Sequence, residues 1–122
     1  MKVLIVDDEE MAIKLVEHQL KLDGFDIITT TDGREAMELI KSEEPDLVIS
    51  DIMMPFMSGL ELLELIKSEK KKTPVILISA LDDVEVIQTA IGMGADDFVI
   101  KPVNMDELTL RVKRVLANNN LA

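Results

Sequence analysis

The sequence contains no cysteine, no tryptophan and no tyrosine, and its three aromatic side chains are Phe25, Phe56 and Phe98. Without cysteine the chain forms neither a disulfide nor a thiolate metal site, and it has no thiol nucleophile, a composition that suits a reducing compartment. Three phenylalanines are too few for the aromatic platform on which many proteins stack nucleic-acid bases.

Positive charge and long apolar runs are also scarce. The chain has 13 Lys and Arg against 24 Asp and Glu, which gives a formal net charge of −11. Since Lys and Arg supply the attraction for nucleic acids and anionic lipids, we expect no direct binding to either. The longest apolar runs, such as Val3–Val6, are too short to cross a membrane, and no signal peptide precedes them. We therefore expect a cytoplasmic domain.

Apolar residues make up 48% of the chain, which is enough to bury a core and argues against disorder. The length of 122 residues fits one compact domain, predicted over 1–122 with 118–122 as a frayed tail. The absence of a linker before Ala122 indicates a protein complete in itself, although a piece of a longer chain would look the same.

Short apolar runs alternate along the chain with longer amphipathic stretches. The runs are rich in β-branched residues, are bounded by Asp, Gly or Pro, and predict strands over 3–6, 25–30, 47–49, 75–78 and 98–100. Three of them are apolar at consecutive positions, which indicates burial on both faces and therefore a parallel sheet covered by helices. The second run is more polar, as is typical of an edge strand.

The intervening stretches have the apolar spacing of helices, predicted over about 10–22, 34–42, 59–70, 83–93 and 105–117. In the first of them, one apolar stripe is expected to contain Ala12, Leu15, Val16 and Leu20. Strict βα alternation predicts an α/β fold, a doubly wound (βα)₅ flavodoxin-like sandwich with a five-stranded parallel sheet in the order 2-1-3-4-5.

Polar residues follow four of the predicted strands, where ligands bind in such folds. They are Asp7, Asp8, Asp51, Ser79 and Lys101, and Ala80 comes directly after Ser79. Three carboxylates gathered within a few ångströms repel one another, and a hard divalent cation relieves this; oxygen ligands alone favour Mg²⁺. A single aspartate at a strand end is more often a helix cap. Capping does not explain why acids, a hydroxyl and a lysine that could act on one ligand follow all four strands.

The chemistry that fits these residues is attack on phosphorus by a carboxylate. The single histidine, His18, falls in mid-helix off the apolar stripe and is expected at the surface, so no Ser–His–Asp set is available. Asp51 is the candidate nucleophile because it is central, with the acids on one side and Lys101 on the other. Lys101 would neutralise phosphoryl oxygens, Ser79 would donate a hydrogen bond to them, and Ala80 would leave space.

In order and spacing, these residues resemble the receiver domain of bacterial two-component response regulators. The resemblance extends from Lys2 to about Leu116 and rests on four motifs: Asp7-Asp8, the nine residues 51–59 (DIMMPFMSG), Ser79-Ala80 and Lys101-Pro102. Each motif alone is weak, whereas all four in order are specific.

The resemblance implies a phosphorylation-dependent signalling switch. Asp51 would accept phosphate from a sensor histidine kinase, a phosphotransfer protein or a small phosphodonor. Asp7, Asp8, Asp51 and the backbone carbonyl of Met53 would hold Mg²⁺. Apart from its own phosphorylation and dephosphorylation, the domain is not expected to be an enzyme.

The resemblance also implies a switch pair, Ser79 and Phe98, and a cis peptide bond before Pro102. Without the resemblance, Phe98 would be interpreted as a core residue. The surface of segments 83–93, 98–100 and 105–117 would be remodelled for a downstream protein target.

Two positions are expected to tune dephosphorylation. In the family, the side chains two residues after the phosphoacceptor and two after the switch hydroxyl flank the attacking water. Here they are Met53 and Leu81, both apolar, so we expect slow self-dephosphorylation.

The partner surface is less well defined by sequence. Segment 83–93 is apolar on more than one side, and Ile87 is expected to be exposed. Segment 94–98 is similar to that of receivers that dimerise when attached to winged-helix DNA-binding domains, where Asp97 with Arg111 would form a cross-dimer ion pair. Because Ile87 stands where a basic residue is typical, and another is missing near Asn118, a weak homodimer is left open.

Three other functions fit parts of the pattern. A receiver-like interaction module that takes no phosphate would not need the complete set of acids, Ser79 and Lys101. A Mg²⁺-dependent aspartyl-phosphate phosphohydrolase usually has a second aspartate where this chain has Met53. A flavodoxin-like electron carrier needs a phosphate cradle after the first strand, where Asp7 and Asp8 would repel phosphate.

Overall fold

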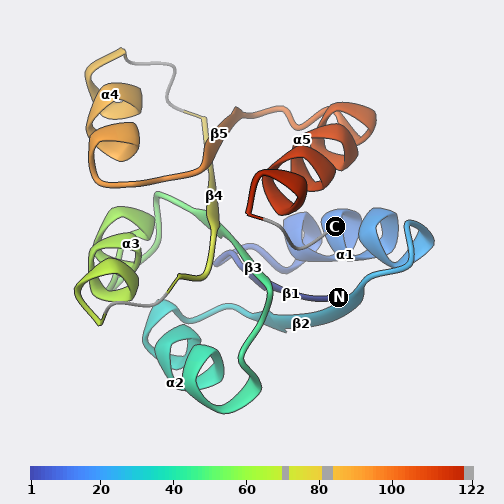
Figure 1. Ribbon diagram of the computed structural model, residues 1–122, viewed down its shortest axis with the longest axis horizontal. Helices are drawn as coiled ribbons and strands as arrows, with labels where there is room; N and C mark the ends of the chain where they lie inside the picture. Colours follow the sequence, from blue (N-terminus) through green and yellow to red (C-terminus); the bar gives the residue numbers. More distant parts are fainter. Residues whose placement is uncertain (70–71, 81–83, 120–122) are drawn as a thin grey trace.

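The computed structural model describes residues 1–69, 72–80 and 84–119 and shows five strands and five helices in alternation (Figure 1). The strands are β1 (Lys2–Val6), β2 (Asp26–Thr30), β3 (Leu47–Asp51), β4 (Val75–Ser79) and β5 (Asp97–Ile100). The helices are α1 (Glu10–Leu22), α2 (Gly33–Glu43), α3 (Gly59–Ser68), α4 (Val84–Gly92) and α5 (Met105–Asn118). The predicted α/β class and the order of elements are confirmed.

The five strands form one parallel sheet in the order β2-β1-β3-β4-β5, as predicted. Val6 lies opposite Ser50, and Asp51 lies opposite Ile78. The register therefore brings the carboxyl ends of the three central strands to the same edge of the sheet.

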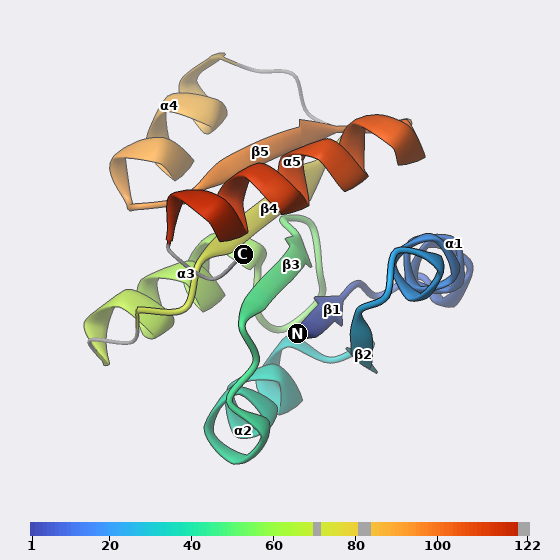
Figure 2. The ribbon, with the colours of Figure 1, turned by 45° about the vertical axis from the view of Figure 1, so that its right-hand side comes forward.

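Each face of this sheet has its own layer of helices (Figures 1 and 2), and the strand side chains alternate between the two faces. In β1, Val3 and Ile5 pack toward α1 and α5, whereas Leu4 and Val6 pack toward α2, α3 and α4. Burial on both sides explains why these strands are apolar at consecutive positions.

Helix α1 differs from its predicted orientation. The residues that it buries are Ile13, Val16 and Leu20, while Leu15 is exposed, so the predicted stripe is wrong at Leu15. Apolar residues lie at adjacent positions on this helix, and packing against the sheet selects the set that includes Ile13. His18 is exposed, as predicted.

Helix α5 ends at Asn118, and Asn119 caps it with a side-chain amide that donates to the carbonyl of Val115 at 2.8 Å. Residues 120–122, the remainder of the predicted tail, lie outside the described residues. Among the helices in the described ranges, none is both long and apolar enough to cross a bilayer.

Candidate functional site

Three aspartates meet at the carboxyl edge of the sheet. Asp7 follows β1 and Asp51 ends β3, the neighbouring strand, so the topology places them side by side. Carboxylate oxygens of Asp7, Asp8 and Asp51 lie within 4.8 Å of one another. Asp7 and Asp51 are each only 5% exposed, whereas Asp8 is exposed, so the cluster opens to solvent on one side.

Lys101, just beyond the end of β5, supplies positive charge to this cluster. Its Nζ lies 2.7 Å from Oδ2 of Asp51 and 3.6 Å from Oδ2 of Asp7. The Lys101–Pro102 bond is cis, as the resemblance implied. The structure thus brings together the three predicted acids and the predicted lysine.

The electrostatics of the cluster reflect an excess of negative charge. Burial raises the pKa of Asp7 above the usual range, and the charges of Asp51 and Asp8 raise it further. Burial alone would lower the pKa of Lys101, but its hydrogen bond to Asp51 and the charge of Asp7 raise it instead. One lysine does not neutralise three acids, and a set of oxygen ligands open to solvent fits Mg²⁺ with several retained waters.

The loop after Asp51 is folded back onto that residue. The N–H of Met53 donates to Oδ1 of Asp51 at 3.1 Å. At its far end, the N–H of Gly59 donates to the carbonyl of Ile52 at 2.9 Å. A Cβ on Gly59 would collide with the backbone oxygen of Asp51, so the loop closes this tightly only with glycine there.

Sequence reasoning assigned no role to Gly59. The signal was present in its position, since a glycine that begins a helix contributes little to helix stability and points to a close backbone approach.

The predicted switch residues lie on one face of the sheet. Phe98 is buried and pairs in register with Leu77, and Ser79, two residues after Leu77, is completely buried. Ala80 follows as an exposed residue. The burial of Phe98 suits a core residue as well as a switch residue, so the roles of Ser79, Ala80 and Phe98 stay predictions.

This combination of fold and strand-end residues has counterparts among known proteins. The family model of the response regulator receiver domain matches residues 3–113. This chain belongs to that family.

Relatives of this receiver domain include the alkaline phosphatase synthesis transcriptional regulatory protein PhoP of Bacillus subtilis, 35% identical over 99% of this chain and 50% of PhoP. The regulatory protein AtoC of Escherichia coli is 41% identical over 94% of this chain and 25% of AtoC. The chain thus spans half or less of these relatives. The solved receiver domain of Francisella response regulator 1452 has a TM-score of 0.92 and 34% identity, with 96% of this chain and 97% of that one covered.

The predicted partner surface of the receiver domain needs one correction. Ile87 is partly buried against the core under α4, so the prediction of an exposed Ile87 is wrong. The apolar residues exposed on α4 are Val84 and Ile91. Helix periodicity gives the width of an apolar stripe but not its rotation toward the sheet. Leu81, the second predicted dephosphorylation position, lies outside the described residues.

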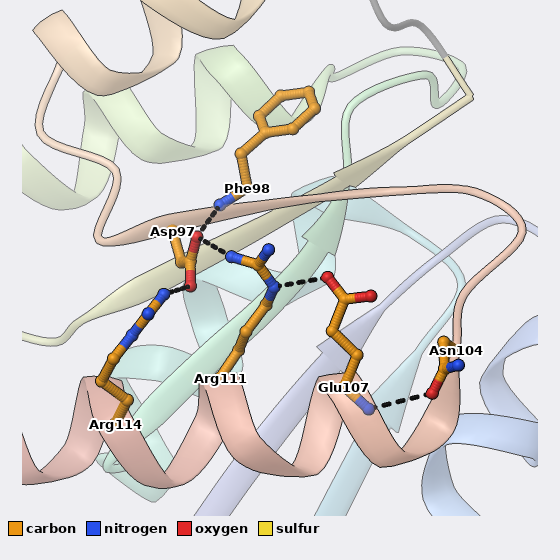
Figure 3. Close-up of polar contacts among 6 residues, drawn as sticks. All are labelled: Asp97, Phe98, Asn104, Glu107, Arg111 and Arg114. Carbon is orange, nitrogen blue, oxygen red and sulfur yellow. Dashed lines mark hydrogen bonds and ion pairs between the residues drawn. The ribbon is translucent and has the colours of Figure 1, made fainter.

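Asp97 and Arg111, predicted as a pair across a dimer, are paired within one chain (Figure 3). Oδ1 of Asp97 lies 2.8 Å from Nη1 of Arg111, and its Oδ2 lies 2.8 Å from Nη2 of Arg114. Burial acts to raise the pKa of Asp97, but the N–H of Phe98 and the two guanidinium groups hold that pKa below its usual range.

Arg114 was missed by sequence reasoning. It lies three residues after Arg111 on α5, a spacing that places both guanidinium groups on the same side of the helix. Its partner Asp97 belongs to β5, and no local pattern connects the two elements.

Proposed function

We propose that this receiver domain is a phosphorylation-dependent switch in which Asp51 accepts the phosphoryl group. The observation that carries the proposal is the meeting of Asp7, Asp8 and Asp51 within 4.8 Å, with Lys101 at 2.7 Å from Asp51. An oxygen of Asp51 attacks phosphorus, the new O–P bond forms, and the bond from phosphorus to the donor breaks. The donor would be a phosphohistidine of a sensor kinase or phosphotransfer protein, or a small acyl phosphate.

The three aspartates, with the backbone carbonyl of Met53, would hold Mg²⁺, which neutralises the charge that develops on the phosphoryl oxygens. Lys101 already binds the acceptor carboxylate and would neutralise the same oxygens from the other side. Ser79 would donate a hydrogen bond to the phosphoryl group, and Ala80 would leave room for it.

The output of the switch would be a changed protein-binding surface on α4, β5 and α5. Movement of Ser79 toward the phosphoryl group would change the packing of Phe98, which lies on the same face of the sheet. Decay of the acyl phosphate would be slow, because the exposed side chain of Met53 has no group that orients or deprotonates water. The aliphatic side chain of Leu81 likewise carries no group that could orient or deprotonate water.

Acetyl phosphate and MgCl₂ test the proposal when the products are followed by intact mass. Wild type should gain one phosphoryl group, and Asp51→Asn should gain none. An unmodified wild type would indicate the interaction module that takes no phosphate. An adduct that persists in Asp51→Asn would place the acceptor elsewhere.

A further inference from the structure

The β3–α3 loop (residues 52–58) contains a strained turn at its apex. Phe56 has φ +70°, and the N–H of Met57 donates to the carbonyl of Pro55 at 2.8 Å across it. A three-residue turn with positive φ is the rare and strained form of the γ-turn, and phenylalanine lacks the freedom of glycine there. Because the side chain of Phe56 is 79% exposed, burial in the core does not explain why this conformation is kept.

The ring of Phe56 lies against Arg34, a residue in the first turn of α2. Cζ of Arg34 lies 4.4 Å from the centroid of the ring, within the range of a cation–π interaction. Asp32 fixes the guanidinium group, with Nε at 3.2 Å from Oδ1 and Nη2 at 3.0 Å from Oδ2. Asp32 also caps α2 by accepting the N–H of Arg34 at 2.8 Å. Asp32 therefore orients the guanidinium group that contacts the ring.

The start of α2 supports the same loop at a second point. A Cβ on Gly33 would lie 3.1 Å from the carbonyl oxygen of Met57 and 3.2 Å from its Cβ. The backbone of α2 thus lies directly against the residue that follows Phe56. The hydrogen bond from Gly59 to Ile52 closes the loop at its base, so Met53 and the turn at Phe56 belong to one closed loop.

We infer that Arg34 is a positioning residue for the phosphorylation site. By holding Phe56 in the positive-φ turn, Arg34 fixes the loop in which the N–H of Met53 donates to Asp51 and from which the carbonyl of Met53 would help to hold Mg²⁺. This inference rests on the proposed function, and it adds a residue outside the four family motifs.

The test is a comparison of Arg34→Ala with Lys41→Ala, in metal-free protein and during titration with MgCl₂. Lys41 is a matched control because it is on the same helix, carries the same charge, and is 57% exposed against 59% for Arg34. In Arg34→Ala the amide signal of Met53 should shift before metal is added, and Mg²⁺ should bind about two- to fivefold more weakly, as expected from loss of an exposed cation–π contact. Lys41→Ala should leave the signal and the affinity unchanged.

The direction of the change in Mg²⁺ affinity shows whether Arg34 acts by positioning the loop or only through its charge. Removing a nearby cation would strengthen Mg²⁺ binding if Arg34 acted only through its charge, whereas loss of positioning weakens it. Phe56→Leu should reproduce the loss, and the double variant should lose nothing further. In a Phe56→Gly background glycine adopts the turn unaided, so Arg34→Ala should then have no effect.

Three results would overturn the inference: equal or tighter Mg²⁺ binding in Arg34→Ala, an unshifted Met53 amide, or the same loss in the Phe56→Gly background. A wild type that binds no Mg²⁺ would overturn the proposed metal site instead. In that case the role of Arg34 would be decided only by whether the Met53 amide signal shifts in metal-free Arg34→Ala.

Discussion

Two aspartates at opposite ends of the sheet differ in the charges that surround them. Asp51 lies with two further aspartates and one lysine, whereas Asp97 lies with two arginines. In the first cluster burial raises the pKa of Asp7, and neighbouring acids add to it. In the second cluster burial also acts to raise the pKa of Asp97, but the hydrogen bonds that Asp97 accepts outweigh burial, and its pKa is lowered.

The balance of charge distinguishes a cluster that could accept a cation from one that links two elements of the fold. The first cluster keeps negative charge that a cation would neutralise, while the second is neutralised within the chain and joins β5 to α5. A buried carboxylate in a receiver domain therefore indicates a cation site only where the surrounding side chains leave its negative charge unbalanced.

The largest expected difference between the clusters is in the rate of phosphorylation when a basic side chain is removed from each. Lys101→Met should slow phosphorylation by acetyl phosphate about 100-fold, since the loss of one donor to transition-state charge has about this effect. Arg111→Met should leave the rate unchanged. The rates come from intact mass against time, and equal rates in the two variants would contradict a catalytic difference between the clusters.

Gly59 lies against the backbone of Asp51 and Ile52 and far from Asp97 in the sequence, so a methyl group there should disturb the first cluster and not the second. Gly59→Ala should lower the free energy of unfolding by about 1–3 kcal/mol, because the Cβ collides with backbone. Gly92→Ala is the control and should not destabilise, since among the described residues no atom beyond its own helix backbone and chain neighbours lies within 4 Å of the added Cβ. Urea denaturation measures both, and equal midpoints would contradict the tight closure of the loop.

Neutral replacements of the two largely buried acids should change stability in opposite directions at pH 7 without metal. Asp97→Asn should lower the free energy of unfolding by about 1–2 kcal/mol, since two guanidinium groups lose an ionised acceptor. Asp7→Asn should raise it by about 1 kcal/mol, because it removes a buried charge and its repulsion with Asp51 and Asp8. Urea denaturation measures the free energy of unfolding of both variants. A change of the same sign in both would contradict the difference between the two clusters.

The same two variants should respond differently to acid. The stability that Asp97 contributes is present above the pKa of an unfolded aspartate, about 3.9, and is lost as pH falls through its lower folded value. The raised pKa of Asp7 acts oppositely, since protonation in the folded state relieves repulsion. The advantage of Asp7→Asn should therefore disappear at a higher pH than the deficit of Asp97→Asn.

The smallest expected effect concerns the lifetime of the phosphorylated form. Met53→Asn should shorten it several-fold, because an amide beside the acyl phosphate can orient the attacking water. Met11→Asn, an equally polar change at an exposed methionine on α1, should leave the lifetime unaltered. Equal decay in Met53→Asn and wild type would remove Met53 from the control of dephosphorylation.

The sequence predicted the sheet and the acid cluster because both depend on periodic or topological rules. Consecutive apolar residues in Val3–Val6 required burial on both faces, and a parallel sheet then gathered Asp7, Asp51 and Lys101 at one edge.

The features that sequence reasoning missed depend on the rotation of helices and on close approaches between distant segments. Ile13 rather than Leu15 faces the core, and Ile87 is partly buried, since packing selects among adjacent apolar positions. The contact of Arg34 with Phe56 joins residues that are 22 positions apart on different elements. No periodic pattern records a contact of this kind.

The central claim is that the acid cluster of this receiver domain binds Mg²⁺, and a titration with MgCl₂ followed by amide signals tests it most directly. We expect the signals of Asp7, Asp8, Asp51 and Met53 to shift together and saturate, while that of Asp97 stays in place. In Asp51→Asn the same shifts should require much more metal. Unmoved signals at the cluster in wild type, or equal shifts at Asp97, would contradict the account.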